Sequence, residues 1–197
     1  MEDLEPNTQY IVSVIAIDEH GNRKSSMPIK IVTKARTYLY KEGEEYTELT
    51  GGWIRGNYNI GTFTKASDHL NLQASFPGTT NKYWITCETT NSIDVTGFKK
   101  IVYKIKIDNM ILYPDEGWYA WSGVGICKPR FVDYNNASGI AITPFARMES
   151  DISKQIITIK TDITNINEHV YPTAYFARYT IDNYEGNLNI YEVWLEE

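Results

Sequence analysis

The chain has 197 residues, and its 19 basic and 25 acidic side chains give a formal net charge of −6. A negative charge with no basic stripe repels a phosphate backbone, so nucleic acid is excluded as an expected partner. No apolar run approaches the roughly 20 residues of a membrane-spanning helix, and no membrane span is expected. Fifteen Tyr and five Trp, with short runs rich in Val, Ile and Thr, predict an all-β chain.

Residues 1–34 have the pattern of two strands and a turn. An alternating run at 10–17 is joined by turn residues at 18–22 to a second strand at 29–33. The run is preceded by Leu4, Pro6 and Thr8 and begins with Tyr10. This pattern resembles the last two strands of a fibronectin type III module, in which a corner tyrosine turns its hydroxyl onto the preceding loop. We therefore expect residues 1–34 to be the C-terminal fragment of such a module within a longer protein.

A hairpin without the rest of its sandwich is marginal in water and has unpaired edges. Its apolar side chains include Ile11, Val12, Val14 and Ile15. We expect the hairpin either to pair with the same hairpin of another copy or to pack against the following domain.

Residues 38–197 are expected to form the second domain, an antiparallel β-sandwich. Strand candidates follow at regular intervals, at 61–65, 70–75, 83–89, 100–108, 117–127, 139–148, 154–160, 173–181 and 188–195. Turn residues separate them, which favours two packed antiparallel sheets. Only residues 161–169 could hold a short helix, with Asp162 or Thr164 near its N-terminus.

The two-residue period of a strand assigns side chains to faces. In strand 100–108, Ile101, Tyr103, Ile105 and Ile107 share one face, and the lysines with Val102 share the other. This strand is expected to have one face in the core and one in water.

In strand 188–195, Tyr191, Val193 and Leu195 oppose Ile190, Glu192 and Trp194. Both faces are largely apolar, which is typical of a central strand or of one whose second face is covered.

Two turns and two cysteines also have expected structural roles. Gly51 and Gly52 can take positive φ and turn the chain so that Trp53 enters the sandwich. In 93–97, Asp and Thr side chains are expected to bond nearby backbone amides. Cys87 and Cys127 are expected to be buried free thiols, with a cross-strand disulfide as the alternative.

Three phrases of the second domain carry a resemblance: 49–53 (LTGGW), 90–98 followed by strand 100–108, and 188–195 (LNIYEVWL). In this order and spacing they resemble the jelly-roll domains of phage and prophage tail or minor structural proteins of Gram-positive bacteria. The resemblance implies a non-enzymatic module for assembly or host-surface attachment, located in a virion tail or outside the cell. Its implied partners are host-surface glycans or other tail proteins, and a homo-oligomer is expected. The alternatives are a carbohydrate-binding module of a secreted or surface bacterial protein, and a spacer without a ligand.

A sugar platform could be formed by Trp118, Tyr119 and Trp121, with Trp84 as a second candidate. Flat aromatic faces stack on sugar rings, and adjacent carboxylates accept hydrogen bonds from hydroxyl groups. Alternation puts Tyr119 and Trp121 on one face of the strand and Trp118 on the other. The competing interpretation, which is favoured, is an ordinary sandwich core on one face and a ring covered by a loop on the other.

The acidic turn at Glu42, Glu44 and Glu45 has the oxygen ligands that a structural calcium ion prefers, although a solvated acidic turn explains it more simply. No other cofactor is indicated. The three histidines are scattered and no G-x-S-x-G sequence is present, so we expect no enzymatic activity.

Overall fold

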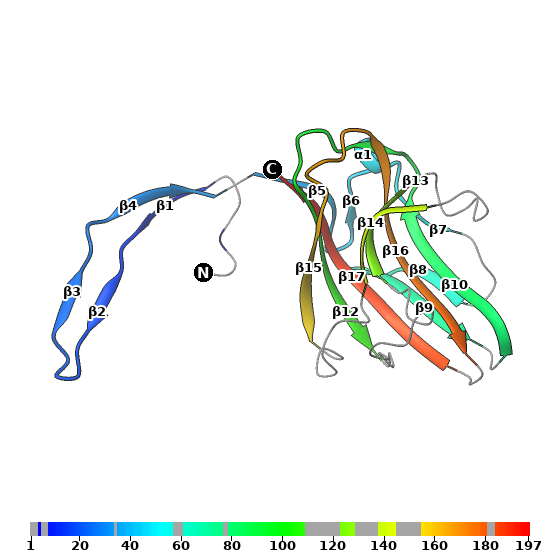
Figure 1. Cartoon of the computed structure of the whole chain (residues 1–197), viewed down its shortest axis with the longest axis horizontal. Helices are drawn as coiled ribbons and strands as arrows, with labels where there is room; N and C mark the ends of the chain where they lie inside the picture. The colour runs from blue at the N-terminus through cyan, green and yellow to red at the C-terminus, as the bar shows by residue number, and fades with distance from the viewer. Residues whose placement is uncertain are drawn as a thin grey trace. The chain divides into compact units, whose positions relative to one another are not determined.

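A computed structural model describes residues 4, 8–33, 35–56, 61–76, 79–108, 123–128, 138–144, 155–180 and 184–197 of the chain. Two compact units are present: Met1–Arg36 together with Glu197, and Thr37–Glu196. The first unit contains a hairpin and the second is a β-sandwich (Figure 1). The sandwich confirms the predicted all-β antiparallel fold class.

Residues 8–33 form the hairpin, here called the arm. Strand β1 (Gln9–Val12) pairs antiparallel with β4 (Ile29–Val32), and β2 (Ile15–Ile17) pairs with β3 (Arg23–Ser25). The Asp18 carboxylate closes the turn, because its Oδ1 accepts hydrogen bonds from the backbone amides of His20 and Asn22, each at 2.9 Å. The predicted strands at 10–17 and 29–33 and the turn between them are confirmed.

Two sheets build the sandwich from the described residues. The six-stranded sheet has the order β14 (Ser138–Pro144), β13 (Gly123–Lys128), β16 (His169–Thr180), β10 (Thr79–Thr89) and β7 (Trp53–Arg55), and β11 (Ile93–Asp94) also pairs with β16. The seven-stranded sheet has the order β15 (Ile156–Asp162), β12 (Lys100–Asp108), β17 (Tyr184–Glu196), β5 (Arg36–Lys41) and β6 (Glu44–Glu45). In the same sheet β9 (Leu70–Phe76) pairs with β17, and β8 (Gly61–Lys65) pairs with β9. Both sheets therefore combine strands from distant parts of the chain.

Alternating aliphatic positions of both sheets form the core. Strand β12 places Ile101, Tyr103, Ile105 and Ile107 inward, each at most 2% exposed, as its sequence predicts. The six-stranded sheet contributes aliphatic and thiol groups at alternating positions of β10 and β13: Ile85, Cys87, Val124 and Ile126. Removal of this apolar area from water is the main stabilising contribution to the sandwich.

Hydrogen bonds also join the sheets through the core. The Tyr103 hydroxyl donates to the carbonyl of Gly125 at 2.7 Å, and the Thr161 hydroxyl donates to the carbonyl of Val124 at 3.3 Å. Full burial raises the pKa of Tyr103 well above its usual value, so the phenol remains a donor. Strands β12 and β15 are thereby fixed to β13.

The predicted glycine turn is confirmed. Gly51 and Gly52 have φ of +66° and +94°, and Trp53, which follows them, is fully buried. The four-residue helix α1 (Thr47–Thr50) lies just before this turn, and the sequence patterns did not predict it. The expected turn at 93–97 is also present, since Asp94 Oδ1 accepts a hydrogen bond from the Thr96 amide at 2.9 Å.

Two expectations are wrong. Residues 161–169 contain no helix; Asp162 Oδ1 instead accepts a hydrogen bond from the Thr164 amide at 2.9 Å and stabilises a turn. Ile190 does not share a face with Glu192 and Trp194, because a β-bulge at Tyr191 shifts the register between β12 and β17. Ile190 is fully buried in the core as a result. The other expectation for this strand is confirmed, since β17 is central.

The cysteines are as expected. Cys87 and Cys127 are both buried thiols, and neither forms a disulfide. Burial raises the pKa of Cys87, so its thiol stays protonated. Among the described residues there is no membrane-crossing helix.

Candidate functional site

The aromatic platform predicted from the sequence falls largely outside the described residues. Trp118, Tyr119 and Trp121 belong to a segment that is not described. Trp84 lies in β10, where its backbone pairs with Ala177, but its side chain is also outside the described set. The platform therefore stays a prediction.

The acidic turn has structural contacts. Glu45 pairs with Lys65 at 2.6 Å, and Glu44 accepts a hydrogen bond from the Tyr46 hydroxyl at 3.5 Å. The backbone amide of Glu42 donates to the carbonyl of Tyr191 at 2.8 Å and thus stabilises the bulge in β17. No group of three metal-type ligands occurs in the described part of the chain.

Polar side chains gather on the outward face of the seven-stranded sheet. This face, here called the polar face, is the side of β9, β17, β12 and β15 that points away from the core. Alternation produces it, because Leu70, Leu72, Leu188 and Ile190 are buried in the core while the asparagines between them point outward. The ladder then places Asn71 of β9 directly beside Asn189 of β17.

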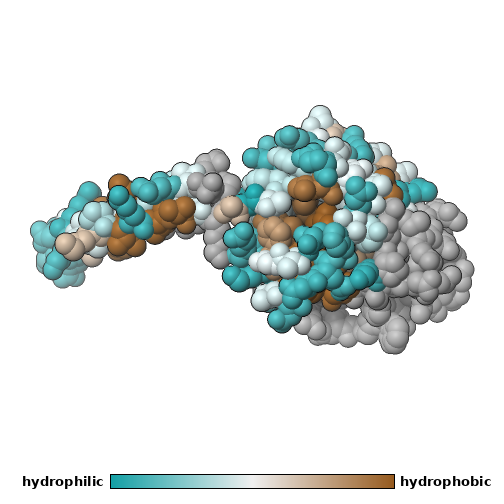
Figure 2. All heavy atoms as spheres, turned by 90° about the horizontal axis from the view of Figure 1, so that it is seen from above, coloured by the Kyte–Doolittle hydropathy of each residue, from teal (hydrophilic) through white to brown (hydrophobic). Residues whose placement is uncertain are grey.

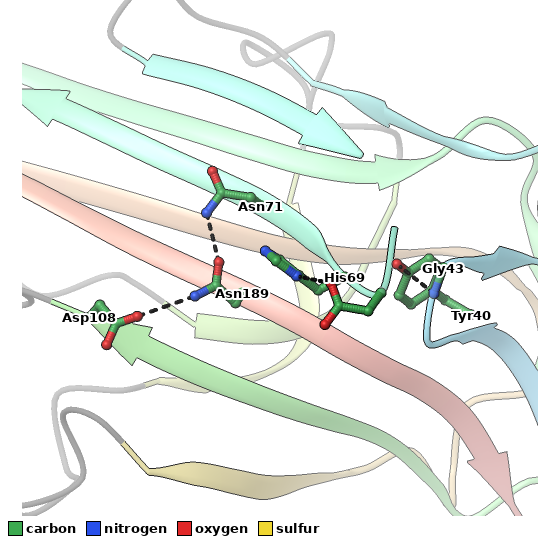
Figure 3. Close-up of polar contacts among 7 residues, drawn as sticks. Tyr40, Gly43, His69, Asn71, Asp108 and Asn189 are labelled. Carbon is green, nitrogen blue, oxygen red and sulfur yellow. Dashed lines mark hydrogen bonds and ion pairs between the residues drawn. The ribbon is translucent and has the colours of Figure 1, made fainter. Parts of the chain in front are cut away.

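A hydrogen-bonded row crosses three strands of the polar face (Figure 3). Asn71 Nδ2 donates to Asn189 Oδ1 at 2.7 Å, and Asn189 Nδ2 donates to Asp108 Oδ2 at 3.3 Å. Lys106 Nζ pairs with the other oxygen of Asp108 at 3.1 Å. Asn189 is only 9% exposed, whereas Lys106 and Asp108 keep about a third of their side-chain surface in water at 31% and 28%. The row thus has a fixed centre and accessible polar ends.

A second polar pair lies beside this row. Lys104 Nζ contacts Glu192 Oε1 at 2.8 Å, and the two residues are direct neighbours in the β12–β17 ladder. Glu192 is 6% exposed, and Lys104 covers it while keeping 35% of its own side chain exposed. A carboxylate this deeply placed is stable because its charge is compensated by the ammonium group.

Aromatic rings lie at two places along β17 on the polar face. The His69 ring lies 5.4 Å from the ring of Tyr191, and His69 precedes Asn71 by two residues on the same side of the chain. Toward the end of β17, the ring of Tyr38 lies 6.0 Å from Trp194 and 6.2 Å from Tyr46. Trp194 is 4% exposed, so partly exposed rings of Tyr38 and Tyr46 form the surface there. Polar hydrogen-bonding groups and aromatic surface therefore occur together.

This site was missed by the sequence analysis. Asn71 and Asn189 each interrupt an aliphatic run, as Leu-Asn-Leu and Leu-Asn-Ile. They are 118 residues apart, and only the pairing of β9 with β17 brings them together.

Comparison with known proteins gives structural neighbours only. No family model matches the chain, and no curated protein matches it. One similar solved structure comes from work on the promiscuous specificity of carbohydrate-binding modules of the β-sandwich superfamily. It has 16% identity and a TM-score of 0.49, with 96% of this chain and 74% of that chain covered.

A second similar structure is a carbohydrate-binding module that specifically recognises mannan. It has 12% identity and a TM-score of 0.43, with 82% of this chain and 98% of that chain covered. At these TM-scores neither structure assigns a ligand or a binding residue to this chain.

Proposed function

We propose that the sandwich unit is a non-catalytic module that binds a neutral glycan on its polar face. The observation that carries the proposal is the row Asn71–Asn189–Asp108, in which amides and a carboxylate are held by one another across three strands. The ordered row favours the carbohydrate-binding alternative over a plain spacer, because a spacer has no need of polar side chains held in this way.

The chemistry of the row suits sugar hydroxyl groups. Each hydroxyl is both a donor and an acceptor, and the row offers amide donors, amide and carboxylate acceptors, and the ammonium group of Lys106. Asn189 is too buried to contribute much contact area, so its role is to position Asn71 and Asp108. Because these side chains are already ordered, binding loses little side-chain freedom. Tyr38, Tyr46 and Tyr191 supply partly exposed rings for the apolar faces of a sugar.

The charges of the polar face favour a neutral ligand. Three ammonium groups are each matched by a carboxylate: Lys104 with Glu192, Lys106 with Asp108, and Lys160 with Glu196. The chain as a whole carries −6 and repels polyanions. An acidic polysaccharide would have to break these pairs before it gained a partner.

The biological setting that we propose follows from the sequence motifs. Their resemblance to tail proteins of phages from Gram-positive bacteria suggests attachment to a glycan of the host surface, outside the cell. Several copies in one particle would convert weak single-site binding into strong adhesion.

The test is binding of the whole chain to neutral and acidic polysaccharides and to Gram-positive cell walls, with Asp108→Ala as the informative variant. Loss of one charged hydrogen-bond partner costs about 1.5–3 kcal/mol, so the variant should bind about 10-fold to 100-fold more weakly. Glu168→Ala is the matched control, because Glu168 is also a partly exposed carboxylate paired with a lysine, but its partner Lys128 lies in β13 of the six-stranded sheet, away from the polar face.

Circular dichroism and thermal unfolding establish that both variants are folded. Saturable binding that Asp108→Ala weakens and Glu168→Ala preserves supports the proposal. If the folded chain binds no glycan and no cell wall, or if both variants bind as the parent does, the polar face is not a glycan site.

A further inference from the structure

The arm exposes one uncharged strand edge. In the described residues β1 pairs only with β4 and β2 only with β3, so residues 9–17 form one edge of a two-stranded ribbon. Four aliphatic side chains of this edge are largely in water: Ile11 (69%), Val14 (69%), Ile15 (55%) and Ile17 (59%). Figure 2 shows apolar side chains on the surface of the arm. Such an edge is a template for pairing with another strand.

The two edges of the ribbon differ in charge. Residues 9–17 contain no charged side chain, whereas the returning strand carries Arg23, Lys24 and Lys30. Basic residues on an edge strand oppose pairing with a second copy of the same edge, because like charges would face each other. Charge repulsion therefore disfavours self-association through the basic edge, whereas no charge opposes self-association through residues 9–17.

The uncharged edge is symmetric in sequence. Residues 11–15 read Ile-Val-Ser-Val-Ile, which is the same in both directions around Ser13. An antiparallel pair of two such strands, related by a two-fold axis at Ser13, places Ile11 opposite the partner's Ile15 and Val12 opposite the partner's Val14. Matched β-branched pairs of this kind stabilise a sheet.

Backbone directions agree with this register. The carbonyls of Thr8 and Val14 accept hydrogen bonds from the returning strand at 3.0 and 2.8 Å, and the Asp18 amide donates to it at 3.1 Å. Even-numbered residues therefore turn their backbone groups into the arm, and odd-numbered residues turn theirs to the free edge. In the proposed register odd residues face odd residues and even residues face even residues. The odd pairs, whose backbone groups point to the free edge, can therefore form the inter-strand hydrogen bonds.

We propose that two copies of the chain associate through the edge formed by residues 9–17, antiparallel about a two-fold axis at Ser13. Two marginal two-stranded ribbons then become one four-stranded sheet, which exceeds the three strands that a sheet with an apolar face needs to be stable on its own. The interface is isologous, because each copy contributes the same patch. This inference is independent of glycan binding, although a dimer would present two polar faces.

The first test is oligomeric state and cross-linking of the full chain. Sedimentation should show a dimer with a Kd of about 10 µM or tighter. Oxidation of Ser13→Cys should give a covalent dimer, because paired Cα atoms across an antiparallel ladder lie within disulfide reach. Ser25→Cys is the control on the returning strand. Cys87 and Cys127 are buried and do not interfere.

The second test addresses the register. Ile11→Lys combined with Ile15→Lys should weaken dimerisation at least about 10-fold, since like charges then face each other. Ile11→Lys combined with Ile15→Glu should restore it, because each new lysine faces the partner's new glutamate. Ile29→Lys, at a position 60% exposed on the returning strand, should leave the dimer intact.

A chain that stays monomeric at about 100 µM overturns the proposal. So does a dimer that the double-lysine variant leaves unchanged, or one in which Ser25→Cys cross-links as readily as Ser13→Cys. In those cases the uncharged edge pairs with a different protein or with nothing.

Discussion

Replacement of Gly43 by alanine tests how the tight turn between β5 and β6 supports the polar face. Gly43 has φ of +93°, and a Cβ there would lie 2.1 Å from the carbonyl oxygen of Ser67. Cβ atoms in proteins essentially never approach another heavy atom closer than 3.0 Å, so this contact would be 0.9 Å too close (3.0 − 2.1). The Ser67 backbone would have to move, and Ser67 lies in the turn that leads into β9, just before His69 and Asn71.

Gly97→Ala is the matched control. Gly97 has a similar φ of +87°, but a Cβ there would meet nothing within 4 Å. Both variants therefore carry the cost of a positive φ for alanine, about 1–2 kcal/mol. Only Gly43→Ala also disturbs its turn, where the Gly43 amide donates to the Tyr40 hydroxyl oxygen at 3.0 Å and the Glu42 amide donates to the Tyr191 carbonyl at 2.8 Å.

Loss of these two bonds at about 1 kcal/mol each gives Gly43→Ala an extra cost of about 2 kcal/mol. The free energy of unfolding, measured by urea denaturation with tryptophan fluorescence, should fall by about 3–4 kcal/mol for Gly43→Ala and about 1–2 kcal/mol for Gly97→Ala. Equal values for the two variants, within about 0.5 kcal/mol, would refute the steric reasoning.

Two further outcomes follow from buried tyrosines. Tyr103→Phe should lower the free energy of unfolding by about 1–2 kcal/mol, because it removes the hydrogen bond to Gly125 that joins the sheets; an unchanged urea midpoint would contradict this role. Burial raises the pKa of Tyr40 to about 12, from the ordinary value near 10 of the unfolded chain. Between these two pH values the unfolded chain loses the Tyr40 phenol proton while the folded protein keeps it. The free energy of unfolding is therefore unaffected by Tyr40 below about pH 10 and declines as the pH rises toward 12. Urea midpoints across this range should decline less steeply for Tyr40→Phe than for the parent.

Local chemistry explains what could be predicted from the sequence. The two-residue period assigned the faces of β12, and glycines with positive φ marked the turn before Trp53. The Asp18 and Asp94 turns were predictable because their hydrogen bonds span two to four residues. The arm was predicted for the same reason, since its strands are adjacent in sequence.

Tertiary structure decided the features that depend on register between distant strands. The face of Ile190 could not be read from β17 alone, because the bulge at Tyr191 exists only against β12 and is supported by the Glu42 amide. The polar row could not be predicted either. Asn71, Asp108 and Asn189 lie on three strands, and each has the ordinary appearance of a solvent-facing residue in its own strand. A strand's period states which face a side chain takes, but only sheet pairing, driven by burial of the opposite face, determines which outward side chains meet.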